Sequence, residues 1–332
     1  NVMSAIGRIL RSETDYDFAG RRARWFRISL IGLFIAVAAL GIRGLNLGID
    51  FVGGTAVLAD NPQGIDVAAL RETLTSQGFD ELRIEELDDG AVFRVRSDAL
   101  TEEGEFELVR LVAEDLGVPP DSTDVSTVGP TFGSQILQSA ITALSVFLGV
   151  VVLFISFRYE FKMAVGAIAA LLHDLLLTFG VYAIVGFEVT PATVVAILTI
   201  LGYSLYDTVV VYDRINEHVE ELKKKTSYAE LVNEAMNEVL ARSLATSLTS
   251  LIPVGSLLFV GSLLLGAGTL QDFALALFVG IAAGTYSSIF VAAPLLVALK
   301  ERADEGTIDP RKRARERQAS TSGYESSRPG RR

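Results

Sequence analysis

The 332-residue chain is 50% hydrophobic and 21% charged, and its apolar residues gather in long runs, as in membrane proteins. It has no cysteine, which excludes disulfides, thiolate catalysis and cysteine-ligated zinc, and its two histidines, His173 and His218, argue against a histidine-based metal cluster. The formal charge of −11 is concentrated in residues 44–129, which hold 19 acidic and 5 basic residues, whereas the remainder sums to +3; this distribution argues against nucleic-acid binding.

Six segments are long and apolar enough to span a bilayer, whose hydrocarbon core requires about 20 apolar residues in a helix. They lie at residues 26–45, 135–157, 161–185, 191–212, 243–265 and 270–299. The first segment shows no small-residue cleavage site, so we interpret it as a signal anchor. The fold class predicted is an α-helical polytopic membrane protein. Its expected parts are an N-terminal segment 1–27, a first helix 28–45, a soluble domain 46–134, five membrane helices within 135–299 and a disordered basic tail 300–332.

Lysine and arginine in the short flanks set the expected orientation. The segment before the first span, the loops after the second and fourth spans and the tail are basic, whereas residues 186–190 and 266–269 contain neither residue type. By the positive-inside rule, both termini are cytoplasmic and the soluble domain is extracytoplasmic. The basic tail can contact anionic membrane lipid, although a simply solvated tail is the favoured interpretation.

Between the first two spans, the sequence predicts a small α+β domain. Alternating apolar residues indicate strands at 55–59, 82–87, 91–96 and 123–128, and amphipathic spacing indicates helices at 66–77 and 102–116. Asp66 is a suitable N-cap for the first of these helices, and Asp88, Asp89 and Gly90 suit a hairpin turn. The resulting order, βαββαβ, is the ferredoxin-like pattern.

Charged side chains inside a membrane span are unfavourable by about 2.5–3.5 kcal/mol each on insertion scales, so they indicate function. His173 and Asp174 lie near the centre of the third span, Asp207 lies inside the fourth, and Arg242 lies at the cytoplasmic end of the fifth. Because a carboxylate in a low dielectric can bind and release a proton near neutral pH, these four residues are candidates for proton coupling. A static Asp–Arg pair that fixes helix packing is the alternative.

Helical spacing extends these charges into polar faces. Tyr203, Ser204 and Asp207 are three and four residues apart on the fourth span, and Arg242, Thr246 and Thr249 share a similar stripe on the fifth, widened by Ser243, Ser247 and Ser250. On the third span, Asp174 and Thr178 are one turn apart. We therefore expect three helices to contribute to one hydrated path. No hydrolase, kinase or dinucleotide-binding motif lies in a fitting context, so an enzyme is not expected.

Five sequence strings, in order, resemble the SecF family of the resistance-nodulation-division superfamily. They lie at 48–55 (GIDFVGGT), 128–130 (VGP), 171–174 (LLHD), 202–215 (GYSLYDTVVVYDRI) and 242–249 (RSLATSLT), and the resemblance extends from about residue 17 to 299. One span, a soluble domain and five further spans is also half of the superfamily's architecture.

The resemblance implies a function in protein export. SecF pairs with SecD beside the SecYEG channel, and the complex uses the proton motive force, without nucleotide or cofactor, to draw a translocating polypeptide across the cytoplasmic membrane at a late stage. The family's intramembrane aspartate falls on Asp207 and its arginine on Arg242. Gly53 and Gly54 would form a hinge between the soluble domain and the membrane, since glycine tolerates unusual backbone angles. Tyr206 departs from many relatives, which have Asn there.

Two other functions stay open. The first is a half-size exporter of lipids or small molecules, for which a small domain with a charge of −14 offers a poor apolar pocket. The second is a passive scaffold that holds SecD at the channel, for which the buried charges would be dispensable. The coupling ion is also open, because sodium would use the same carboxylate.

Overall fold

The computed structural model describes residues 14–79, 82–87, 90–222, 225–261, 268–303 and 306–308. The hairpin tip at 88–89 and residues 266 and 267 of the expected 266–269 loop therefore lie outside the described residues. Of the expected disordered tail 300–332, residues beyond 308 also lie outside them, whereas 300–302 are helical and 307–308 form a strand.

Six helices in the described residues are long and apolar enough to cross a membrane, which confirms the predicted fold class. Each overlaps one predicted span, although the first two helices begin four and five residues earlier than the expected 26 and 135. The six are α2 (Arg22–Arg43), α6 (Pro130–Arg158), α7 (Phe161–Val185), α8 (Pro191–Glu221), α9 (Tyr228–Ser256) with the π-helical turn η3 (Leu257–Gly261), and α11 (Gly268–Ser287) with η4 (Ser288–Ala292) and α12 (Ala293–Arg302).

The fourth and fifth helices extend beyond the predicted spans, which were 191–212 and 243–265. The continuation is amphipathic: Ile215 of α8 and Leu231 and Met236 of α9 are all buried in the same hydrophobic core, and a capping box between Ser227 and Glu230 begins α9. The helices continue past the apolar run because one face still packs, although their other residues are too polar for a bilayer.

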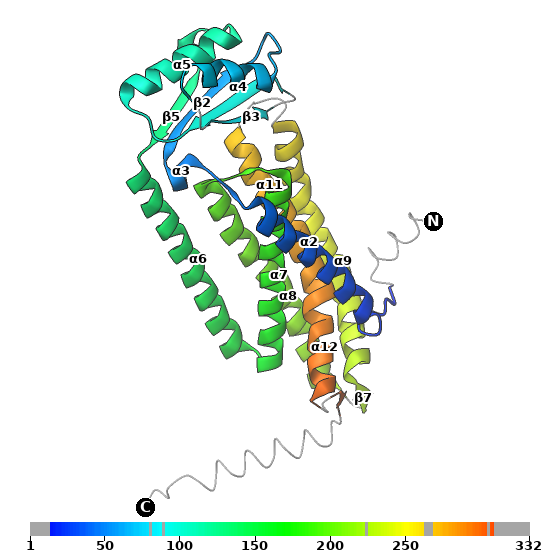
Figure 1. Ribbon diagram of the computed structural model, residues 1–332. Coiled ribbons are helices and arrows are strands. Elements are labelled where there is room, and N and C mark those ends of the chain that lie inside the picture. The colour runs from blue at the N-terminus through cyan, green and yellow to red at the C-terminus, as the bar shows by residue number, and fades with distance from the viewer. Residues whose placement is uncertain are drawn as a thin grey trace, which may run out of the picture.

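Figure 1 shows the arrangement of the parts, with the soluble domain at one end of the helix bundle, here termed the domain end. Helix α2 slants across the bundle, and α6 stands at its side. α2 packs tightly on α7 because Gly180 has no side chain: a Cβ there would lie 2.6 Å from the Cα of Ala36. Close approach of helices through small residues is typical of membrane proteins.

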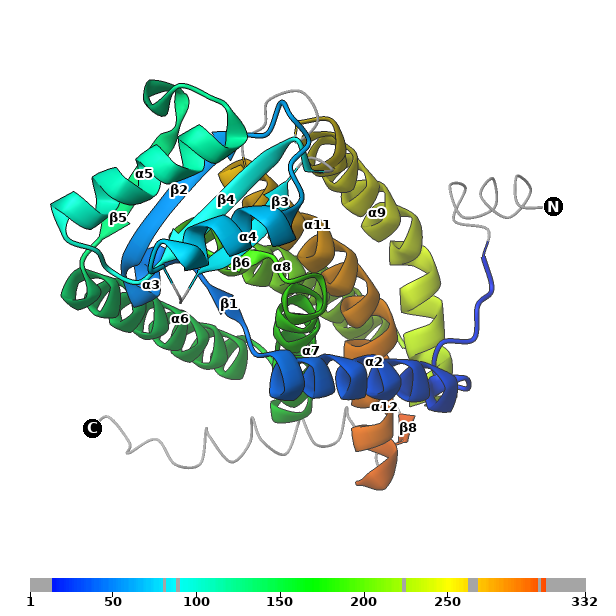
Figure 2. The ribbon, with the colours of Figure 1, turned by 45° about the horizontal axis from the view of Figure 1, so that its top comes forward.

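The soluble domain contains β2 (Gly54–Asp60), α4 (Val67–Ser76), β3 (Arg83–Leu87), β4 (Val92–Ser97), α5 (Glu102–Leu116), the 3₁₀ turn η2 (Pro120–Ser122) and β5 (Asp124–Val128). The element order is thus the βαββαβ order expected from the sequence. The four strands form an antiparallel sheet in the order β3-β4-β2-β5. In Figure 2, α4 and α5 cover the sheet face that is turned away from the bundle.

Strand alternation decides what each face of this sheet presents. Phe93 and Val95 of β4 are fully buried in the core that the sheet forms with α4 and α5. Their neighbours Arg94 and Arg96 therefore point to the opposite face, toward the membrane helices.

A short linker connects α2 to the sheet. It contains β1 (Asn46–Leu47), which pairs in parallel with β6 (Glu188–Val189) between α7 and α8, and the one-turn helix α3 (Ile49–Val52). Gly53 and Gly54 follow with φ of +82° and +132°. A Cβ on Gly53 would lie 2.7 Å from the Cα of Pro130, and one on Gly54 would lie 2.5 Å from the carbonyl oxygen of Ser97. Both glycines are thus tightly packed; the hinge stays a prediction.

Further contacts join segments distant in sequence at the end of the bundle opposite the soluble domain. There β7 (Thr226–Ser227), which precedes α9, pairs antiparallel with β8 (Thr307–Ile308). The segment before α2 is held on α9, because the side-chain oxygen of Asn233 accepts hydrogen bonds from the backbone N–H groups of Phe18 and Ala19, both at 2.9 Å.

Candidate functional site

Asp174 of α7 lies at the centre of a buried polar cluster. Its side chain is inaccessible to solvent, and its Oδ2 accepts hydrogen bonds from Ser204 Oγ of α8 (2.6 Å) and Ser287 Oγ of α11 (2.7 Å). The other oxygen, Oδ1, lies 3.1 Å from Nδ1 of His173. Three helices thus meet at one carboxylate; α7 and α8 were expected there, but the third is α11 rather than the expected fifth span.

His173 is the neighbour of Asp174 on the same helix and is equally buried. Its ring stacks on that of Tyr286, with centroids 5.8 Å apart, and its Nε2 has no hydrogen-bond partner among the described residues. Tyr286 in turn shares a hydrogen bond with Ser29 of α2 (3.1 Å). Nδ1 of the imidazole therefore contacts Asp174, whereas Nε2 can still form a hydrogen bond.

Asp207 of α8 is the second buried carboxylate and is 7% exposed. Ser243 Oγ of α9 donates to Asp207 Oδ1 at 2.5 Å and is also close to Oδ2. In the part of the chain that the structure describes, no lysine or arginine lies within ion-pair distance of Asp207 or Asp174. Both carboxylates are therefore held by hydroxyl groups.

Helix α11 connects the surroundings of the two carboxylates. Ser247, one turn after Ser243 on α9, donates to the Ser243 carbonyl (2.7 Å) and lies 2.6 Å from Thr285 Oγ1 of α11. Ser287, two residues further along α11, reaches Asp174. α11 thus contacts α9 through Thr285 and the Asp174 carboxylate through Ser287, two side chains that lie on different sides of the helix.

The structure places Arg242, Thr246 and Thr249 elsewhere than expected. All three are exposed on the outward side of α9. The two threonine hydroxyls donate to carbonyls of their own helix. Arg242 instead lines a surface hollow of about 520 Å³ together with Asp213 and Arg214, among others. The α9 residues that face the site are Ser243 and Ser247, which are buried; the assigned roles of Arg242, Thr246 and Thr249 stay predictions.

Two tyrosines of α8, Tyr203 and Tyr206, precede Asp207 by four residues and by one. The hydroxyl of Tyr203 is buried, and no described residue hydrogen-bonds to it, so it does not join the Asp174 or Asp207 contacts in this structure. Tyr206 is 65% exposed and points away from them. Of the predicted polar face on α8, Ser204 and Asp207 alone contact the site.

The sequence reasoning missed the contribution of the sixth span. Its run of polar residues, Thr285, Tyr286, Ser287 and Ser288, interrupts an otherwise apolar segment, and this was the available signal. Ser288 lies 2.8 Å from Thr208 Oγ1 and donates to the Ser204 carbonyl, so it joins the same core. It also begins the π-helical turn η4, a local irregularity that is frequent at functional sites.

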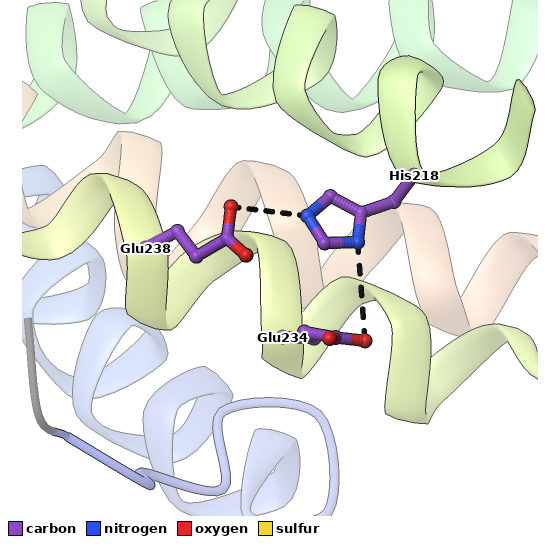
Figure 3. Close-up of side chains that lie close together, drawn as sticks. All are labelled: His218, Glu234 and Glu238. Atoms are coloured by element: carbon purple, nitrogen blue, oxygen red, sulfur yellow. Dashed lines mark hydrogen bonds and ion pairs between the residues drawn. The ribbon is translucent and has the colours of Figure 1, made fainter. Parts of the chain in front are cut away.

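A separate group at the opposite end of the bundle, His218, Glu234 and Glu238, has the composition of a metal site (Figure 3). However, Nε2 of the imidazole faces Glu238 (3.1 Å) and Nδ1 faces Glu234 (3.8 Å), so the carboxylates approach different ring nitrogens. Arg214 Nε also donates to Glu238 at 2.5 Å. Because each ring nitrogen already faces a carboxylate and Arg214 pairs with Glu238, we interpret the group as an ion-pair network between α8 and α9.

Comparison with protein-family models gives two matches. The model described as "Protein export membrane protein SecD/SecF, C-terminal" matches residues 112–302, and the "SecD/SecF GG Motif" matches residues 38–58. The second match contains Gly53 and Gly54.

Curated relatives cover most of the chain. It is 40% identical over 305 residues to the protein translocase subunit SecF of Streptomyces coelicolor, a match that covers 90% of this chain and 82% of the relative. It is 42% identical over 316 residues to the protein translocase subunit SecF of Mycobacterium tuberculosis, with coverages of 91% and 71%.

Comparison with solved structures finds the same family. The crystal structure of SecDF, a translocon-associated membrane protein from Thermus thermophilus, superposes with a TM-score of 0.80 at 38% identity and covers 87% of this chain. The chain spans 39% of that SecDF chain. SecDF in its super-membrane-facing form gives a TM-score of 0.62 at 36% identity.

Six membrane helices with a soluble domain after the first define a polytopic membrane protein, and the resemblance in sequence and fold is to protein-translocase subunits. The chain belongs to the SecF family of protein-export membrane proteins.

Proposed function

We propose that this chain acts with SecD in protein export, and that proton binding and release at Asp207 and Asp174 drives its action. The export function itself is supported by the relatives, which are named as protein translocase subunits. The proton-driven step rests on the chemistry of the two buried carboxylates, and the late-stage timing rests on the family resemblance alone.

The observation that carries the proposal is the type of partner that each carboxylate has. A serine hydroxyl donates to an ionised carboxylate, and after rotation it accepts a hydrogen bond from a protonated one. Ser243 beside Asp207, and Ser204 and Ser287 beside Asp174, can therefore satisfy both protonation states. A fixed arginine partner would instead favour the ionised state alone. The hydroxyl partners thus support proton exchange over a static Asp–Arg pair.

The second support is the location of the two carboxylates. Each lies in a membrane helix, where an ionised group is unfavourable and marks an ion pathway or proton relay by default. Both are buried, so any proton must arrive through the polar contacts between α7, α8, α9 and α11.

The exposed face of α9 supports SecD as the partner. Arg242, Thr246 and Thr249 form a polar stripe on the outward side of a membrane helix. The two threonine hydroxyls donate to carbonyls within α9, but lipid tails cannot satisfy the guanidinium of Arg242, so water, lipid headgroups or a second membrane protein must surround it. In the Thermus thermophilus relative named SecDF, this chain corresponds to 37% of the length, which leaves room for a SecD part in the same chain. We propose that SecD covers this face.

The remaining parts of the proposal concern the surroundings. The basic flanks favour cytoplasmic termini and an extracytoplasmic soluble domain in the cell membrane. The SecYEG channel and a translocating polypeptide are the further proposed partners. We propose that this chain acts on them without nucleotide or another cofactor.

The test is export into membrane vesicles that contain SecD and either the wild-type chain or Asp207→Asn. A preprotein stalled within the channel is followed with and without an imposed proton gradient, in sodium-free buffer. We expect the gradient to accelerate release with the wild type and to have no effect with Asp207→Asn.

Asp213→Asn is the matched control. It lies on the same helix, but its carboxylate is 42% exposed and pairs with Arg158 at 3.0 Å, so it should behave as wild type. If Asp207→Asn assembles with SecD and still responds to the gradient, Asp207 is a packing residue and a passive scaffold becomes the better explanation.

A further inference from the structure

A buried cluster of charged residues joins the soluble domain to the membrane helices. The soluble domain contributes Glu85 of β3 and Arg94 and Arg96 of β4, and the remainder of the chain contributes Asn46 of β1, Glu188 of β6 and Asp272 of α11. These six residues are termed the interdomain clasp. It belongs to neither carboxylate site described above.

Arg96 is the most buried cation of the interdomain clasp, at 6% exposure. Its guanidinium contacts Glu188 (3.2 Å) and Glu85 (2.6 Å) and donates to Asn46 Oδ1 (2.7 Å). It also donates to the backbone carbonyl of Leu47 at 3.2 Å. Arg96 of the soluble domain thus binds both the linker after α2 and Glu188 in the loop before α8.

Arg94 reaches the same carboxylate and one more. It pairs with Glu188 at 2.7 Å and lies 3.5 Å from Glu85 and 3.9 Å from Asp272. Asp272 is 5% exposed, and its Oδ2 has no hydrogen-bond partner among the described residues. The attraction of Arg94 is thus an ion-pair contact between the soluble domain and α11.

The positions of Glu188 and Asp272 connect the interdomain clasp with the middle of the membrane. Glu188 lies three residues before α8 begins, and the Thr193 hydroxyl in the first turn of α8 donates to its carbonyl (3.4 Å). Asp272 lies in the second turn of α11. Figure 2 shows β4 lying across the domain ends of both helices.

These two helices also carry the contacts around the buried carboxylates. Asp207 lies in α8, about 24 Å from its start at a rise of 1.5 Å per residue, and Ser287 of α11 lies about 22 Å from Asp272. A helix is stiff over such a length, so a shift of either helix at mid-membrane must appear at its domain end.

We propose that the interdomain clasp is the joint through which the soluble domain follows movements of α8 and α11. Arg94 and Arg96 are its positioning residues, because each contacts the carboxylate at the entrance to α8 and Arg94 also faces α11. This inference rests on the proposed function, because the movement to be transmitted is the one that proton exchange at Asp207 causes. A physical joint of this kind requires that both ends be attached, and the buried ion pairs provide the attachment.

The first experiment measures the attachment itself. The chain has no cysteine, so Glu72→Cys on α4 and Val185→Cys at the end of α7 can be spin-labelled in the lipid-reconstituted complex with a cysteine-free SecD. Both positions are exposed. We expect one narrow distance distribution in the otherwise wild-type chain and a broadened or displaced one for Arg96→Gln.

Arg110→Gln is the matched control in the same domain. That arginine pairs with Glu107 (2.6 Å) and Glu114 (2.9 Å), but the group lies on the surface of α5, away from the bundle. Its distance distribution should remain narrow. A distribution for folded Arg96→Gln that equals that of Arg110→Gln would overturn the proposal.

Arg96→Gln leaves buried carboxylates without their cation and can therefore prevent folding. Arg96→Lys keeps the charge but lacks the planar fork that reaches Glu188, Glu85 and Asn46 together. It should assemble with SecD and show a smaller broadening in the same direction. An unchanged distribution for Arg96→Lys, when Arg96→Gln does not fold, would count against the interdomain clasp.

The second experiment separates attachment from transmission. In the export assay, Arg96→Lys should lose part of the proton-gradient-dependent release, whereas Arg110→Gln should lose none. A broadened distance distribution with full gradient-dependent release would show that the interdomain clasp attaches the domain without transmitting movement, which refutes the joint. If the wild type itself shows no response to the gradient, the proposed function fails, whereas the distance measurement still decides the attachment.

Discussion

Replacing Gly53 with alanine tests whether the junction between the soluble domain and the membrane helices is as tightly packed as the structure shows. A non-glycine residue at its φ of +82° is unfavourable by about 1–3 kcal/mol. The new Cβ would lie 2.7 Å from the Cα and 2.9 Å from the nitrogen of Pro130, which are backbone atoms that cannot rotate away. Overpacking of this kind typically destabilises by about 1–3 kcal/mol. We therefore expect a total loss of about 2–6 kcal/mol.

Gly64→Ala separates the two contributions. Gly64 has a φ of +65°, but nothing lies within 4 Å of the Cβ that alanine would add, so it carries the backbone penalty alone. The midpoint of urea-induced protease susceptibility, measured on purified protein with each substitution, should fall further for Gly53→Ala than for Gly64→Ala. Equal midpoints would refute the close packing and would favour a loose hinge at Gly53.

Two further predictions concern single polar contacts. Ser287→Ala removes a donor 2.7 Å from Asp174; a hydrogen bond to a charged group contributes about 1.5–3 kcal/mol, so proton-gradient-dependent release should fall at least about tenfold. Ser256→Ala, whose hydroxyl donates to Ile252 of its own helix, should not alter release, and an unaffected Ser287→Ala protein would contradict the assignment. At the other end, the backbone N–H of Gly20 and the amide of Asn233 hold the pKa of Asp17 below its usual value of 3.8. Because this pKa is lowered on folding, the contact stabilises the protein fully above pH 3.8 and less as the pH falls through the lowered value. The fluorescence of Trp25, the sequence's only tryptophan, should change over that acid range in wild type but not in Asp17→Ala; identical titrations would disprove the contact.

The membrane helices and the strands of the soluble domain were predictable because their signals are local. An apolar run of about 20 residues identifies a span wherever it packs, and alternation identifies a half-buried strand. The helix α5 was predicted with its observed bounds, because amphipathic spacing ends where Gly117 takes a φ of +68°. Capping by Asp66 was also correct: its side chain accepts from the N–H of Ala68.

The direction in which a helix turns its polar residues was not predictable. On α9, Arg242 and Ser243 are consecutive and therefore about 100° apart around the axis, and both begin a polar stripe. The sequence offers no reason to prefer one stripe. The structure turns Ser243 and Ser247 inward and leaves Arg242 outside, because small hydroxyl side chains allow α9 to approach α8 and α11.

The interdomain clasp was missed for a different reason. Arg94 and Arg96 alternate with buried residues, so their shared face was visible in the sequence. Their main partner, Glu188, lies more than 90 residues away in a loop that was treated as punctuation between spans. Asp272 was overlooked because one acidic residue near the end of a long apolar run does not prevent the run from spanning.

The interdomain clasp and the buried carboxylates Asp174 and Asp207 differ in chemistry, and the difference supports the functions proposed for them. In the interdomain clasp, Arg94 and Arg96 both pair with Glu188, so protonation of that carboxylate would discard two favourable ion pairs. Around Asp174 and Asp207, hydroxyl groups take the place of cations, so a proton can be gained without leaving an unpaired charge. Attachment requires a constant charge and proton transfer requires a variable one. This difference is the reason why we propose a joint at the interdomain clasp and proton exchange at the two carboxylates.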